Sequence, residues 1–190
     1  VVDAYVLMDD ATEDDERNVL VEENFSASFK IEWPDYVKAG MVVEAKESGL
    51  DDDDIAKKFS WKKTKVKETI AINEIIQDFL VYSTMDLNPD DESGGGLGLG
   101  EHEAENIAAK NYQFFNEAKK SFHHAIRTDI DFKTQFFKWI KEEKFSSFPE
   151  VRIAYKAWQN PEAKAILQSN EPEAAKAAKA VIDYKEKVSN

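Results

Sequence analysis

Six lysines lie within eleven residues of this chain, and no acidic residue interrupts them between Ala56 and Lys67. Side chains of one positive sign are the groups that neutralise the phosphate oxygens of a nucleic acid. The solvated face of an ordinary helix also carries such runs. Whether these lysines form a binding surface or only a solvated helix face therefore depends on the secondary structure that positions them.

The apolar residues around the lysines predict two short helices over residues 50–72, with a tight turn between them. Ile55 and Phe59 form the apolar stripe of the first helix, beside the small Ala56 where the helices would cross. Val66 and Ile70, four residues apart, form the stripe of the second. This arrangement is typical of a helix-turn-helix, whose second helix lies in the major groove of DNA.

The start of the second helix is where we expect base contacts, and the lysines around it would neutralise phosphates. Ser60 occupies the turn, where a glycine is common, and Lys62 is a poorer N-cap than serine or threonine. The side chains expected at the DNA are Lys57, Lys58, Trp61, Lys62, Lys63, Thr64, Lys65 and Lys67.

The segment from Leu20 to Ile72 resembles the middle of a ParB-type protein, and the likeness extends roughly over residues 4–85. Members of that family carry a Glu-Asn box, then a helix, then the helix-turn-helix; here Glu23 and Asn24 match the box. The resemblance implies a nucleotide-binding, sulfiredoxin-like domain upstream, with Glu23 and Asn24 as candidate nucleotide-binding residues. Ala27 stands where the family places an arginine, which counts against nucleotide hydrolysis.

A net charge of −13 opposes DNA binding, but the acidity is confined to one part of the chain. Residues 1–55 hold 17 acidic against four basic residues, whereas residues 56–190 hold 21 of each. Salt screens exposed charges beyond about 8 Å, so a basic face can work beside an acidic segment. An alternative function follows from the same distribution: the acidic segment would mimic nucleic acid or dock a basic protein partner.

The order of elements predicts a mainly α fold with a short N-terminal strand-helix remnant, in which Ala4 to Met8 form the strand. The second motif helix would continue to about Met85 and end at the glycine-rich stretch. The predicted organisation is a ParB-like segment at 1–85, a Gly-rich linker at 86–100 and a C-terminal helical module at 101–190.

Composition and motif content limit which other kinds of protein this chain can be. No apolar run reaches the length of a membrane span, and the absence of cysteine excludes disulfides and thiolate metal sites. No His-Glu-x-x-His spacing is present, and nothing places a serine and an acid beside a histidine. We therefore expect a cytoplasmic protein with no catalytic residue, metal site or cofactor.

The expected partners follow from this interpretation. Double-stranded DNA is the expected ligand, in plasmid or phage partition or in regulation. A homodimer would read two half-sites, and the C-terminal module would pair the protomers or contact another protein. The chain begins with Val1 rather than methionine, so we expect further sequence upstream. A nucleotide hydrolase or nuclease stays an alternative only if that upstream part completes the nucleotide-binding domain.

Overall fold

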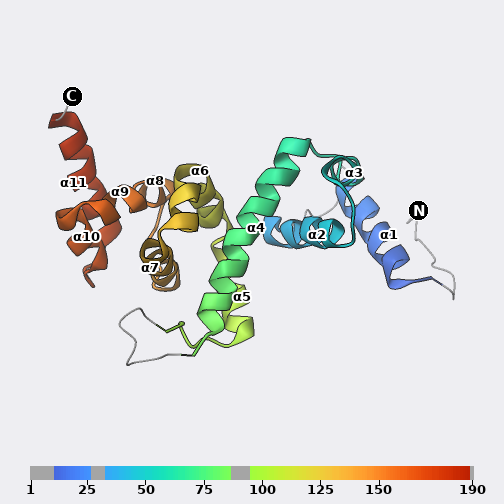
Figure 1. Ribbon diagram of the computed structural model, residues 1–190, viewed down its shortest axis with the longest axis horizontal. Coiled ribbons are helices and arrows are strands. Elements are labelled where there is room, and N and C mark those ends of the chain that lie inside the picture. The colour runs from blue at the N-terminus through green and yellow to red at the C-terminus, as the bar shows by residue number, and fades with distance from the viewer. Residues whose placement is uncertain (1–10, 27–32, 87–94, 189–190) are drawn as a thin grey trace, which may run out of the picture. The chain divides into compact units, whose positions relative to one another are not determined.

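The computed structural model describes residues 11–26, 33–86 and 95–188, and this part of the chain is mainly helical (Figure 1). The predicted fold class is confirmed, while the predicted strand from Ala4 to Met8 lies outside the described residues. The helices are α1 (Glu13–Ser26), α2 (Asp35–Glu47), α3 (Asp52–Lys58), α4 (Lys63–Thr84), α5 (Glu101–Lys110), α6 (Tyr112–Thr128), α7 (Ile130–Lys141), α8 (Phe148–Arg152), α9 (Ala154–Gln159), α10 (Pro161–Gln168) and α11 (Ala174–Val188).

The chain divides into two compact units, Val1–Asn73 and Glu74–Asn190. The division falls inside α4, so one continuous helix contributes its first half to one unit and its second half to the other. The predicted boundary at residues 86–100 does not coincide with this division.

The first unit is built around an apolar cluster shared by α2, α3 and the start of α4. Val42 comes from α2, Ile55 from α3, Phe59 from the C-cap of α3 and Val66 from α4; all four are almost fully buried. Trp61 packs against the cluster from the turn. The two apolar stripes predicted from the sequence are thus confirmed, and α2 supplies the third wall of the core.

Both α2 and α3 end in the same capping arrangement. Gly49 and Ser60 follow the last turns with φ of +97° and +53°. The next amide then reaches back: Trp61 N–H donates to the Ala56 carbonyl at 2.8 Å, and Leu50 N–H donates to the Ala45 carbonyl at 3.2 Å. This is the Schellman pattern, which turns the chain sharply after a helix. It makes the break between α3 and α4 abrupt enough for a helix-turn-helix.

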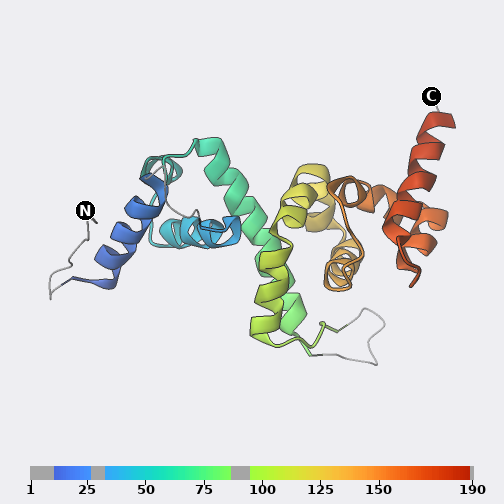
Figure 2. The ribbon, with the colours of Figure 1, turned by 180° about the vertical axis from the view of Figure 1, so that it is seen from behind.

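The second unit has an aromatic core. Phe115, Phe132, Phe136 and Trp139 from α6 and α7 have no exposed side-chain area, which confirms the stripes expected there. Phe79 from the second half of α4 joins them, with its ring centroid 5.4 Å from that of Phe115. Further along the chain, α10 packs against α11 (Figure 2).

Part of the glycine-rich stretch is fixed to the end of α4. Leu97 N–H donates to the Tyr82 carbonyl at 3.1 Å, and Leu99 N–H donates to the Ser83 carbonyl at 2.8 Å. A Cβ on Gly96 would lie 2.3 Å from atoms of Met85, so only glycine allows this approach. Residues 95–100 therefore belong to the packed structure rather than to a free tether.

Candidate nucleic-acid interface

The residues proposed to contact DNA lie on two helices joined by a four-residue turn. α3 ends at Lys58 and α4 begins at Lys63, so the chain breaks at Ser60 and Trp61 as predicted. The Lys62 carbonyl accepts the first amides of α4, from Lys65 at 2.9 Å and from Val66. Lys63, Lys65 and Lys67 thus lie in the first two turns of α4. The first N–H groups of that helix point away from it, along its axis.

The side chains around this helix start divide by exposure. Val66 and Thr69 are buried, and Ile70 is half-buried against the cluster. Of the sequence-predicted residues, Lys58 and Trp61 are half-buried. The exposed ones are Lys57, Lys62, Lys63, Thr64, Lys65 and Lys67. Six of the eight candidates therefore face solvent beside a packed core.

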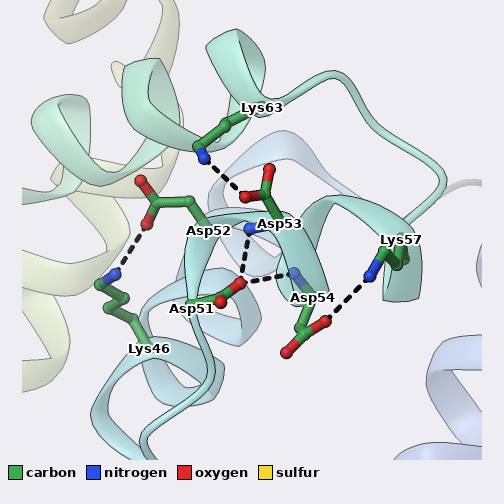
Figure 3. Close-up of polar contacts among 7 residues, drawn as sticks. All are labelled: Lys46, Asp51, Asp52, Asp53, Asp54, Lys57 and Lys63. Atoms are coloured by element: carbon green, nitrogen blue, oxygen red, sulfur yellow. Dashed lines mark hydrogen bonds and ion pairs between the residues drawn. The ribbon is translucent and has the colours of Figure 1, made fainter.

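Several of these lysines are already paired with the acidic start of α3 (Figure 3). Asp53 holds Lys63 at 2.7 Å, and Asp54 holds Lys57 at 3.2 Å. Asp52 pairs with Lys46 of α2 at 2.7 Å. The hydrogen bond that Lys63 donates to Asp53 raises the pKa of Lys63. The candidate surface therefore carries its own carboxylates among the cations.

Asp51 has a structural task that explains its place at the start of α3. Its carboxylate accepts the amides of Asp53 and Asp54 at 2.8 and 2.9 Å, which is N-capping (Figure 3). These two backbone hydrogen bonds lower the pKa of Asp51. The hydrogen bond from Lys46 lowers the pKa of Asp52 in the same way. All four aspartates thus have a partner within the first unit.

Trp61 and Lys65 form a pair of their own. The Lys65 ammonium lies 3.9 Å from the centroid of the Trp61 ring, and that ring lies 5.6 Å from the Phe59 ring. The indole of Trp61 therefore contacts both the apolar core and the Lys65 ammonium, instead of being exposed at the start of α4. Lys58 in turn donates to the Asn18 side chain of α1 at 2.6 Å.

Two lysines differ from the rest. Lys62 and Lys67 are exposed and form no ion pair with any residue that the structure describes. They flank the first turn and a half of α4. They are therefore the cations most readily available to a phosphate.

The candidate nucleotide-binding residues cannot be assigned contacts. Glu23 and Asn24 lie in α1, but their side chains are outside the described part of the chain, and so is Ala27. Across the described residues, no three or more His, Asp or Glu side chains are grouped so as to hold a metal ion. In the same part of the chain, every helix is too short or too polar to cross a membrane.

Comparison with known proteins adds no relative. No protein-family model, no curated protein and no solved structure matches this chain.

Proposed function

We propose that this chain binds double-stranded DNA through the helix-turn-helix of α3 and α4, in partition or regulation as the resemblance to ParB-type proteins implies. The observation that supports it best is the start of α4. There a helix end with free amides, set on a packed three-helix core, presents exposed cations around Lys62 to Lys67. Helix N-termini and lysines are both phosphate-binding groups.

In this proposal the first turns of α4 enter the major groove and Thr64 faces base edges. Lys62 and Lys67 contact phosphates directly. Lys63 and Lys57 exchange their aspartate partners for phosphates on binding. Such an exchange is feasible because ion pairs between exposed side chains contribute little to stability.

The acidic neighbours limit the affinity. Between Asp35 and Ile70 there are eight basic and eight acidic side chains, so the motif has no net charge. Binding then depends on the local asymmetry at the start of α4 rather than on a broad basic field. We expect modest affinity with a small number of phosphate contacts.

A salt titration of duplex binding tests the proposal. Each phosphate contact contributes about 0.9 to the slope of log affinity against log salt. Replacing both Lys62→Ala and Lys67→Ala should weaken binding and reduce the slope by about 1.8. A variant with Lys156→Ala and Lys176→Ala, two exposed lysines of the second unit, is the matched control and should keep the wild-type slope.

Two results would count against DNA binding. One is an absence of duplex binding by the wild-type chain at low salt. The other is an equal loss in the motif variant and in the control, since that would mean a diffuse charge effect.

One observation favours a second candidate, the docking of a basic protein. The first turn of α1 carries Glu13, Asp14, Asp15 and Glu16, and all four are exposed. A chain that binds a basic probe such as cytochrome c or a histone, and not duplex DNA, would have this function instead.

A further inference from the structure

An open groove of about 310 Å³ lies in the second unit, between the end of α4 and the start of α7. The residues that line each side of it are spaced three, four and seven apart, so they lie on a single face of a helix. On one side they are Asp78, Val81 and Tyr82 of α4 and Met85 just after its end; from α7 they are Ile130, Lys133, Thr134 and Phe137. Two neighbouring helices thus present matching stripes to the same hollow.

The exposed rim of this groove is apolar. Val81, Met85 and Ile130 are exposed to 62, 52 and 70 %. Phe137 and Tyr82 form the floor, with ring centroids 6.0 Å apart. A cluster of large exposed apolar side chains around a hollow marks an interaction surface rather than an ordinary solvated one.

The floor also contains an unsatisfied polar group. The Tyr82 hydroxyl is buried and has no hydrogen-bond partner among the described residues. Buried phenol groups nearly always find a partner, so within the part of the chain that the structure describes this hydroxyl stands out as unsatisfied.

The charges at the groove are self-complementary. Asp78 of α4 and Lys133 of α7 form an ion pair at 2.9 Å across it. The groove therefore carries one anion and one cation, in a chain whose net charge of −13 makes copies repel elsewhere. In a two-fold arrangement the same surface meets itself, and each Asp78 would then also face a Lys133 of the other copy.

We propose that this groove binds the same groove of a second copy of the chain, so that two α4 ends and two α7 starts form a four-helix arrangement. Helix pairs with such apolar stripes commonly complete their cores in this way. The choice of a second copy rests in part on the proposed function, because a helix-turn-helix protein commonly reads two half-sites as a dimer. α4 carries both features, the lysines at its start and the groove at its end.

Sedimentation equilibrium of the full chain without DNA tests self-association directly. Val81→Lys or Ile130→Lys places a charge in the proposed interface and should weaken dimerisation at least about a hundredfold. Val188→Lys is the matched control, since Val188 is exposed to 69 % and lies away from the groove. Circular dichroism establishes that each variant is folded.

A mixing experiment separates contact between copies from effects inside one chain. An Asp78→Lys chain has two cations at the groove, and a Lys133→Asp chain has two anions. Each alone should remain monomeric, because like charges would face each other across the two-fold axis. An equal mixture should form heterodimers, which a role within a single chain does not predict.

The outcomes are separable from those of the DNA test. A wild-type chain that stays monomeric up to its solubility limit, or a mixture that stays monomeric, would overturn the proposal even if DNA binds. Unchanged dimerisation in Val81→Lys and Ile130→Lys would place the interface elsewhere. Dimerisation lost as predicted in a chain that binds no DNA would leave the groove assignment standing and remove only the proposed function.

Discussion

At the scale of single residues, the aspartates in the first turn of α3 control how much positive charge the motif can offer. Asp53 and Asp54 each hold a lysine that the proposal assigns to phosphates, Lys63 and Lys57. The carboxylates stay close to any DNA that these lysines would contact. They therefore act against binding twice, by occupying the cations and by repelling phosphates.

We expect Asp53→Asn combined with Asp54→Asn to strengthen duplex binding on the order of fivefold at low ionic strength, because two like charges near the phosphates are removed. Fluorescence anisotropy with a labelled duplex measures the affinity. Glu103→Gln with Glu105→Gln, two exposed carboxylates of α5, serves as the control and should change little. Equal gains in both variants would point to net charge rather than to the motif.

The cap at Asp51 gives the fold a predictable response to acid. Its pKa is lowered in the folded chain by the amides of Asp54 and Asp53. A lowered folded pKa means that the stabilisation is complete above the ordinary aspartate value of about 4 and is lost as the pH falls below it. An asparagine keeps the cap without a titrating group.

We therefore expect Asp51→Asn to lose less stability than the wild-type chain when the pH is lowered from neutrality through this range. Urea unfolding followed by far-UV circular dichroism at a series of pH values makes the comparison. Parallel pH profiles for the two chains would mean that Asp51 does not contribute to acid sensitivity.

At the scale of elements, spacing in the sequence was enough to predict which residues point inward, because a helix repeats its faces every three to four residues. Ile55, Phe59, Val66 and Ile70 all join the core as expected. The turn was predicted at the right place, although serine stands where glycine is usual.

The polar contacts of the site were not predictable in the same way. Only the pair between Asp54 and Lys57 follows from helical spacing, because residues three apart lie on the same face of a helix. Asp53 and Lys63 are ten residues apart. Their meeting depends on the exact bend at Ser60, which no local pattern encodes. The cation over Trp61 likewise depends on where the turn places the indole.

The turn itself offers a direct test. Ser60 adopts a φ of +53°, a left-handed conformation that costs a residue with a Cβ about 1 kcal/mol or more. Ser60→Gly should stabilise the chain by about 0.5 to 1 kcal/mol, after the greater freedom of glycine in the unfolded chain is subtracted. Ser48→Gly, at the corresponding helix end with an ordinary φ of −72°, should destabilise instead. Chemical denaturation of both variants decides whether the strain is real.

At the scale of the whole chain, the sequence predicted the helical class, while its expected boundary at 86–100 differs from the division inside α4. Glycines and acidic residues are typical of a flexible linker, and composition does not show that the backbone amides at Leu97 and Leu99 are bonded to the end of α4. Periodicity did predict that the second motif helix continues to about Met85, and α4 runs to Thr84, but it does not show that the second half of α4 packs into the next core. A helix shared by two units has a single apolar pattern, so periodicity alone gives no sign of the change.

The position of the boundary leads to the last prediction, on two shortened chains. Residues 74–190 should fold alone, because they keep the second half of α4 over the aromatic core. Residues 95–190, which are the C-terminal module expected from the sequence (101–190) and the six residues before it, should be far less stable. They lack Phe79, whose ring lies 5.4 and 5.5 Å from those of Phe115 and Phe137.

Losing one buried phenylalanine costs about 3 to 5 kcal/mol, a large share of the roughly 5 to 15 kcal/mol that stabilises a typical domain. Far-UV circular dichroism during thermal unfolding should therefore show a cooperative transition for residues 74–190 and a weak or absent one for residues 95–190. Dye binding to exposed apolar surface should be higher for the shorter chain. Equal stability of the two would mean that α4 only rests on the aromatic core, and that the glycine-rich stretch is the true border between the units.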